Sequence, residues 1–329
     1  MRRAINIILS LVIVFTCACT KVDNGSVPPV SESDFPYIFF DAMVAQTKSN
    51  LLTGSSLPTA EKTSFGVYGN DGTKLVFENV KMYRPDAGAS FIYDELVLWE
   101  DNTYDFYAYY PYNDSNSNSN VEVVLGDDSP VPYISYTQPT SLDKMVDVMT
   151  ASAIGKTPSS NPVPLTFNHR LFALDVVLVN AQKSDDNTDN TDNTLNISKV
   201  ELKLSNLISS AKLYFDGTIS PVGTEYNYSE YSYDNQNNIE IKSGDNAYDI
   251  NGEGSFLLLP CESFYFSITI EGTDEWGSFT YSTEKKVTCD GGFLAGKQYQ
   301  LSITKKAENG FIVKLPVKWE DGEIGFTFQ

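Results

Sequence analysis

Short runs of alternating apolar and polar residues recur along this chain, and turn-forming residues separate them. An apolar residue at every second position is typical of a β-strand with one buried face. Asn, Asp and Gly between the runs favour tight turns, and no segment carries an apolar stripe of helical period over three turns. We therefore predict an all-β fold of packed sandwiches. The expected strands span residues 37–45, 64–68, 74–83, 89–93, 96–99, 104–110, 121–125, 133–136, 146–151, 163–179, 197–204, 211–215, 254–259, 264–270, 278–287, 298–304 and 312–319.

The aromatic content indicates a folded chain, because 20 Tyr and 19 Phe are far more than disordered segments carry. Its 329 residues suggest two domains of roughly 100–200 residues each. We place the boundary in the Pro- and Ser-rich stretch 156–164, which gives β-sandwich domains at 34–160 and 161–329; the Asp-rich stretch 185–194 is the competing boundary. The polar stretches expected to be exposed loops are 113–120, 185–194 and 226–238.

Charge and residue usage exclude several functional classes. The chain has 23 Lys and Arg against 43 Asp and Glu, a net charge of −20 with a pI of about 4.3, which disfavours a nucleic-acid partner. A single His leaves too little for a multi-His metal centre or a nucleophilic relay. No phosphate-binding loop or nucleophile elbow is present. We predict no enzyme activity, no catalytic residue, no cofactor and no metal site.

Two features could carry chemistry but favour a structural interpretation. His169 shares a strand face with Leu165, Phe167 and Leu171, so we expect a packed, hydrogen-bonded side chain. The aromatic run 104–110 could stack on sugar rings, but alternate aromatics are more simply explained as the filling of a sandwich core.

The N-terminus is a targeting segment. Arg2 and Arg3 precede a short apolar stretch, and Ala18 stands directly before Cys19. We interpret residues 1–18 as a lipoprotein signal peptide, Cys19 as the acylated residue, and 19–33 as a flexible tether. An ordinary cleaved secretory signal is the alternative. The protein is therefore expected to be exported and tethered by lipid.

Two further cysteines, Cys261 and Cys289, follow in the body of the chain, where export would permit a disulfide. If the strand 264–270 lies between them in a meander, they are about two strand spacings apart, roughly 10 Å, which is beyond bridging range unless the chain bends. Both outcomes remain open on the sequence.

The C-terminus ends in an alternating segment with Ile324, Phe326 and Phe328 on one face. Such a strand either completes its own sheet or adds to the open edge of a neighbouring chain. Near the other end, a strand within 35–48 is followed by the basic, loop-like Lys48. A protease that cuts there would release the first strand and open a groove.

Several patches together resemble the fimbrillin-like lipoproteins, which build type V fimbriae in Gram-negative bacteria. The patches are Cys19, 104–112 (YDFYAYYPY), 143–151 (DKMVDVMTA), 163–173 (VPLTFNHRLFA) and 312–322 (IVKLPVKWEDG).

The resemblance implies two tandem transthyretin-like β-sandwich domains and export as an acylated precursor anchored in the outer membrane. It also implies that a trypsin-like protease removes an N-terminal strand and that subunits join by strand exchange at the cell surface. Mapped here, the cut falls after Lys48, where the family often has Arg, and the donor strand lies within 322–329.

Three functions follow for testing. The first is a structural or adhesion subunit of a fimbria, whose partners are other subunits, of its own kind or paralogous. The second is a monomeric surface lipoprotein that binds a glycan or host ligand. The third is a secreted enzyme such as a glycosidase, for which the sequence offers no acid/base pair.

Overall fold

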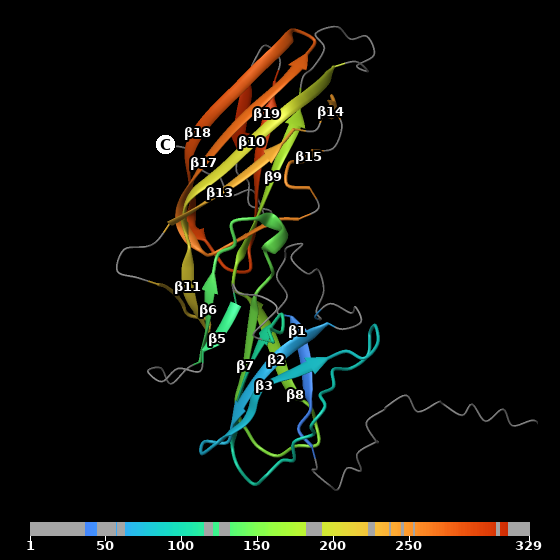
Figure 1. The fold of residues 1–329 in the computed structure, drawn as a ribbon, viewed down its shortest axis with the longest axis vertical. Helices are drawn as coiled ribbons and strands as arrows, with labels where there is room; N and C mark the ends of the chain where they lie inside the picture. Colours follow the sequence, from blue (N-terminus) through green and yellow to red (C-terminus); the bar gives the residue numbers. More distant parts are fainter. Residues whose placement is uncertain are drawn as a thin grey trace, which may run out of the picture. The chain divides into compact units, whose positions relative to one another are not determined.

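The computed structural model describes residues 37–44, 57, 63–114, 121–124, 132–181, 193–222, 228–236, 238–244, 247–252, 254–306 and 310–314. Their regular structure is β-strand throughout, apart from one short 3₁₀ turn at Leu142–Lys144 (Figure 1). The prediction of an all-β fold is confirmed. Backbone polar groups are satisfied in four sheets, whose inward faces carry the apolar half of each alternating run.

The first sheet has six strands in the order β1-β8-β7-β4-β2-β3. All neighbours are antiparallel except β1 and β8, which are parallel. Its buried side chains form one aromatic-rich cluster centred on Phe65, Phe77 and Phe106. The strands are β1 (Phe40–Val44), β2 (Ser64–Asn70), β3 (Leu75–Tyr83), β4 (Tyr104–Tyr110), β7 (Met149–Lys156) and β8 (Val163–His169).

Two five-stranded sheets enclose a second, larger cluster of buried residues, drawn from Phe172 to Ile303. One has the order β13-β10-β17-β18, with β14 also paired to β10; the other has the order β15-β9-β19-β20, with β16 also paired to β9. Figure 1 shows β10, β13, β17 and β18 running side by side. The strands are β9 (Phe172–Asn180), β10 (Thr194–Ile208), β13 (Tyr228–Asn235), β14 (Ile239–Lys242), β15 (Tyr248–Asp249), β16 (Phe256–Leu258), β17 (Cys261–Asp274), β18 (Gly277–Phe293), β19 (Gln298–Lys305) and β20 (Phe311–Lys314).

The fourth sheet combines strands from both halves of the sequence in the order β12-β11-β6-β5. A third cluster of buried residues lies here and includes Tyr109 and Tyr136 together with Leu213. β8 follows the predicted boundary at 160/161 but pairs within the first sheet. The division into domains at that position stays a prediction. The strands are β5 (Val121–Val124), β6 (Tyr133–Thr137), β11 (Ser210–Tyr214) and β12 (Ile219–Pro221).

Several local predictions differ from the structure. The run 163–179, expected as one strand, forms two strands, β8 and β9, which belong to different sheets. The stretch 226–238 was expected to be a loop, which is wrong, because β13 forms there and pairs with β10. The high strand propensity of its tyrosines outweighs the Asn residues around them. Conversely, the expected strands at 89–93 and 96–99 make only isolated bridges, Tyr83 with Ile92 and Tyr37 with Leu98.

Candidate functional site

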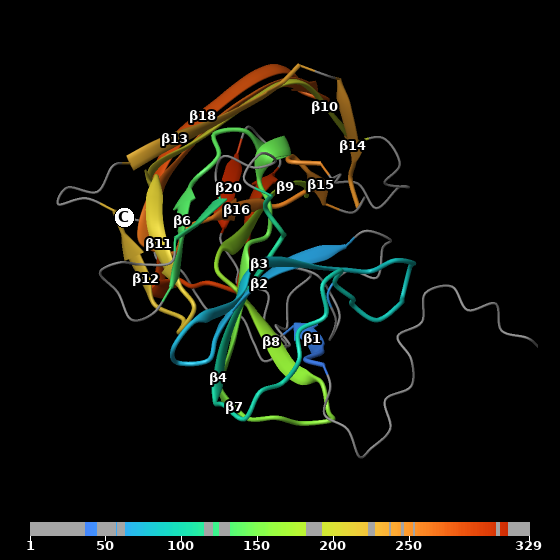
Figure 2. The ribbon, with the colours of Figure 1, turned by 60° about the horizontal axis from the view of Figure 1, so that its bottom comes forward.

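β1 is the most separable strand of the first sheet. Among the described residues it lies at the sheet edge and pairs with β8 alone, in parallel register from Phe40↔Val163 to Val44↔Phe167 (Figure 2). Just before the strand, the carbonyl of Phe39 accepts a hydrogen bond of 2.7 Å from the backbone N–H of Val163. A strand with one hydrogen-bonded neighbour leaves the sheet without breaking any other ladder.

The inward side chains of this edge strand are nevertheless part of the core. Phe40, Ala42 and Val44 are buried while Asp41 and Met43 face outward, as the alternation requires. The ring of Phe40 makes edge-on contacts with two other core aromatic rings. The contacted rings are Phe77 at 5.5 Å and Phe106 at 5.2 Å between centroids.

The segment before β1 is also held in this core. Ile38 is fully buried, and its backbone N–H donates to the carbonyl of Val97 at 2.9 Å. Its own carbonyl accepts a 2.6 Å hydrogen bond from the hydroxyl of Tyr93. Full burial of a side chain such as Ile38 or Phe40 contributes about 1.5–3 kcal/mol. Removing this segment would therefore leave an apolar groove along β8.

The other predicted assembly residues cannot be compared with this geometry. Cys19, Lys48, Ile324, Phe326 and Phe328 lie outside the described residues. The structure supplies the strand that the predicted cut would release.

His169 is a buried structural residue at the end of β8, as the sequence pattern indicates. Its Nδ1 lies 2.8 and 2.9 Å from the two carboxylate oxygens of Asp147. Because a carboxylate only accepts hydrogen bonds, Nδ1 carries the proton. Nε2 is buried and has no hydrogen-bond partner among the described residues. A site enclosed in this way offers no access to a substrate.

The aromatic run in β4 packs on both faces of its sheet. Tyr104 and Phe106 belong to the cluster that surrounds Phe40, whereas Tyr109 belongs to the cluster of the fourth sheet. The Tyr109 hydroxyl donates to Oδ1 of Asn79 at 2.7 Å, and burial raises the pKa of this hydroxyl. These rings are core, which leaves few faces free to stack on sugars.

Cys261 and Cys289 lie on adjacent strands, β17 and β18. The predicted separation by two strand spacings is wrong, because β17 begins at Cys261 and pairs directly with β18. Both cysteines are free and half-buried, and both pack against the core between the two five-stranded sheets. Burial raises the pKa of the Cys261 thiol to about 12, which makes it a poor nucleophile.

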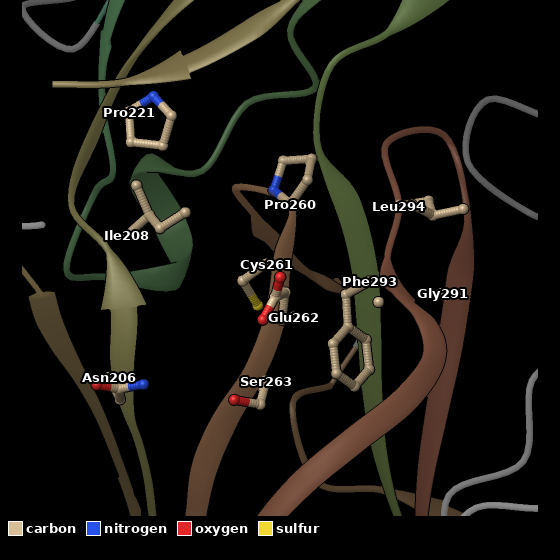
Figure 3. A pocket seen from close by; sticks show the side chains of 11 residues that line it. Asn206, Ile208, Pro221, Pro260, Cys261, Glu262, Ser263, Gly291, Phe293 and Leu294 are labelled. Atoms are coloured by element: carbon tan, nitrogen blue, oxygen red, sulfur yellow. The ribbon is translucent and has the colours of Figure 1, made fainter.

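A pocket of about 440 Å³ opens beside Cys261, where β17 begins and β18 bulges (Figure 3). Pro260, Ile208 and Phe293 line it, together with the carboxylate of Glu262. Among the residues that line it, Glu262 supplies a carboxylate and Cys261 a thiol. Across the described ranges, no three His, Cys, Asp or Glu side chains gather to hold a metal ion. No helix in those ranges has the length and apolarity to span a membrane.

The family of this chain follows from a sequence comparison. A family model described as fimbrillin-like matches residues 52–318. The chain belongs to the fimbrillin-like family. This match confirms the resemblance drawn from the sequence patches. The chain has no significant match among curated proteins.

One solved structure shows the same fold as this fimbrillin-like protein, and two others align with it less closely. A fimbrial protein from Bacteroides vulgatus aligns with a TM-score of 0.60 at 16% identity, covering 89% of this chain and all of that one. A putative cell adhesion protein from Bacteroides uniformis aligns with a TM-score of 0.48 at 18% identity, covering 86% and 97%. The fimbrial anchor protein Mfa2 from Porphyromonas gingivalis aligns with a TM-score of 0.34 at 12% identity, covering 87% and 99%.

Membership of the fimbrillin-like family gives the function in outline. The family comprises fimbrial structural and adhesion proteins and not enzymes. Membership of this family indicates a location in a cell-surface fimbria and assembly with other fimbrial components.

Sequence reasoning missed the contacts that join the fimbrillin-like protein's first sheet to the fourth. Arg170 follows β8 directly, and its buried Nη2 donates to the carbonyls of Gly217 at 2.6 Å and Thr218 at 3.0 Å. The ring centroids of Tyr107 and Phe215 lie 5.7 Å apart. The signal was present as a charged residue between two apolar runs, but nothing in the sequence names its partner.

Proposed function

We propose that this protein is a fimbrial subunit that polymerises by strand exchange after its first strand is removed. The observation that carries the proposal is β1, an edge strand with buried side chains and a single hydrogen-bonded neighbour. In this scheme Cys19 is acylated after export and tethers the precursor to the outer membrane. The subunit acts without catalysis, through main-chain pairing and side-chain pockets.

Release of β1 is the activating step. A protease cuts after Lys48, a short distance beyond Val44, so the released piece contains the whole of β1. The groove left behind exposes the pocket of Phe40, between Phe77 and Phe106. Exposed apolar surface of this kind favours rapid capture of a replacement strand.

The replacement strand is the C-terminal segment of a neighbouring subunit. Ile324, Phe326 and Phe328 have the period-two spacing of Phe40, Ala42 and Val44. One of the two phenylalanines takes the aromatic pocket of Phe40. Such matched alternation lets a foreign strand pair with β8 and bury its apolar face at the same time.

Assembly of trimmed protein tests this function. Protein cut after Lys48 should form ladders or filaments, whereas the same protein lacking residues 322–329 should not. Trimmed full-length protein that stays monomeric at high concentration would contradict the proposal. If that monomer also binds immobilised glycans, the alternative of a monomeric surface lipoprotein is favoured.

A matched pair of substitutions tests which face of the donor strand matters. Phe326→Ala should slow or abolish ladder formation, because it removes an apolar side chain from the buried face. Thr327→Ala, on the opposite face, should leave assembly unchanged. Equal effects of the two changes would exclude insertion of this segment as an alternating strand. Determining the N-terminus of protein recovered from the cell surface distinguishes two forms. The tethered precursor begins at acylated Cys19, and the processed subunit begins at Ser49.

A further inference from the structure

A buried Lys–Asp pair joins the two five-stranded sheets. Lys305 ends β19 and Asp274 ends β17, and these strands belong to different sheets. The side chain of Lys305 is fully buried and that of Asp274 is 2% exposed. Lys305 Nζ lies 3.0 Å from Asp274 Oδ2. The two strands cannot pair through their backbones, so this contact links them through side chains alone.

Aromatic rings surround the amine. Lys305 Nζ lies 5.4 Å from the ring centroids of Trp276 and Phe311 and 5.5 Å from that of Phe279. Tyr281 stacks on Phe311 at 4.4 Å and extends the apolar wall. These rings keep water from the pair and hold the amine in place through cation–π contacts.

The carboxylate is oriented from its other side. Asp274 Oδ1 accepts a 2.9 Å hydrogen bond from the backbone N–H of Trp276, which leaves Oδ2 facing Lys305. Nζ has one further acceptor, the carbonyl of Lys306 at 3.2 Å. The amine of Lys305 and the carboxylate of Asp274 are therefore held at contact distance in one orientation.

Burial makes this pair different from the exposed ion pairs of the same chain. Lys74 lies 3.3 Å from Glu100, but both side chains are 58% exposed and water solvates both charges. Two charges enclosed by apolar rings carry a desolvation penalty of several kcal/mol each. A reaction that joins the two groups as a neutral amide removes both charges and with them both penalties.

We propose that Lys305 and Asp274 form an intramolecular isopeptide bond. One proton passes from Nζ to Oδ2, the Nζ lone pair attacks Cγ of Asp274, and the Nζ–Cγ bond forms. The Cγ–Oδ2 bond breaks, and Oδ2 leaves as water with the transferred proton and a second proton from Nζ. The ammonium and carboxylate thus become one amide and one water, with no oxidant or other reactant.

The geometry favours this reaction in two ways. Fixing amine and acid in contact replaces a bimolecular encounter, an effect equivalent to an effective concentration of about 10⁵–10⁸ M in well-oriented systems. Oδ1 stays on the carbon, and the Trp276 N–H that it already accepts stabilises the charge that develops there. The amide then ties β17 to β19 covalently, across sheets with no shared ladder. This inference does not depend on the proposed function.

Peptide mapping of the full-length protein tests the bond without any substitution. A tryptic digest should contain a branched peptide that joins the segments around Asp274 and Lys305. Its mass should be lower than the sum of its parts by one water molecule, and Lys305 should resist trypsin. Recovery of both segments as separate, unmodified peptides would overturn the proposal. The segment around the exposed Lys74 is the internal control and should be unlinked.

Two variants then separate the bond from a simple ion pair. Lys305→Arg keeps a charge beside Asp274 but cannot form this amide, so it should gain the mass of water beyond the substitution itself. It should also migrate more slowly than wild type on denaturing gels, because the unfolded chain loses its internal loop. Lys74→Arg should change neither property. If Lys305→Arg fails to fold, the wild-type peptide map still decides.

Discussion

β1 and β17 both bury the apolar side chains of their inward faces but differ in how their backbones are held. β1 has five residues, runs parallel to β8 and has no other neighbouring strand in the described part of the chain. β17 has 14 residues and lies between β10 and β18, antiparallel to both. The comparison teaches that burial fixes where a strand packs, whereas pairing on one or both sides determines how easily it leaves.

Each backbone hydrogen bond contributes roughly 0.5–1.5 kcal/mol to stability. The free energy needed to open the two regions therefore differs more through the number of hydrogen-bonded neighbours than through the burial of side chains. The register of β17 on β18 runs from Cys261↔Phe293 to Asp274↔Gly277. Opening that hairpin means breaking a long ladder on each side. Opening β1 means breaking one short ladder at an edge.

The largest effect is expected in the doubly paired region. Phe266 is fully buried in the middle of β17, and Phe266→Ala should lower the free energy of unfolding by about 3–5 kcal/mol. The neighbouring Tyr265 is 39% exposed, so Tyr265→Ala should change the free energy of unfolding by less than about 1 kcal/mol. Urea denaturation of the full chain measures both. Similar losses at the two positions would show that this sheet face is not a core.

The same substitution at the edge strand should cost less. Phe40→Ala removes a core ring, but an edge strand can shift to fill the space, so we expect a loss of about 3 kcal/mol, at the lower end for such changes. It should also speed the exchange of β1 amide protons. Asp41→Ala, on the outward face, is the control and should stay within about 0.5 kcal/mol. If Phe40→Ala lowers the free energy of unfolding as much as Phe266→Ala does, the edge strand does not shift to fill the space left by the ring.

A third change acts on the strand that holds β1. Asp147→Ala leaves the buried Nδ1–H of His169, the last residue of β8, without an acceptor, so we expect a loss of about 1–3 kcal/mol. Asp147→Asn retains an acceptor oxygen and should lose less. Thermal unfolding of the three proteins side by side provides the measurement. An order in which Asn is worse than Ala would refute the hydrogen-bond explanation.

Alkali should weaken the hairpin region. Burial raises the pKa of Cys261 from 9.0 to about 12, so the folded protein holds this proton more tightly than the unfolded chain. Its contribution to stability is complete below pH 9 and is lost as pH rises toward 12. Cys261→Ala should therefore flatten the decline in melting temperature above pH 9. An unchanged decline in that variant would assign the effect to other groups, such as the buried tyrosines.

Acid should weaken the six-stranded sheet, with the smallest effect of the series. The carboxylate of Asp71, in the turn between β2 and β3, accepts hydrogen bonds from the Thr73 hydroxyl at 2.7 Å and the Lys74 N–H at 2.9 Å. These bonds lower its pKa from 3.8 to about 2. The contribution is present above about pH 4 and is lost as pH falls toward 2. The difference in melting temperature between wild type and Asp71→Asn should shrink over that interval; a constant difference would contradict this.

Alternation allowed the strands of both regions to be predicted, but not their partners. Every second residue from Ile38 to Val44, and every second residue from Phe264 to Ile270, is buried in the structure. The period of two says nothing about which strand lies alongside, which is why Cys261 and Cys289 were placed too far apart. The Lys305–Asp274 pair was invisible for a related reason: each residue alone looks like an ordinary solvated charge. Only the fold encloses them.

The direction of β1 has a thermodynamic consequence for any strand that replaces it. Parallel pairing is slightly less stable per residue than antiparallel pairing. Among the described strands of its sheet, β1 alone is held by parallel pairing without an antiparallel neighbour. A replacement that entered the vacated edge in the opposite direction would form the stronger ladder. Exchange would then run downhill in free energy and be hard to reverse.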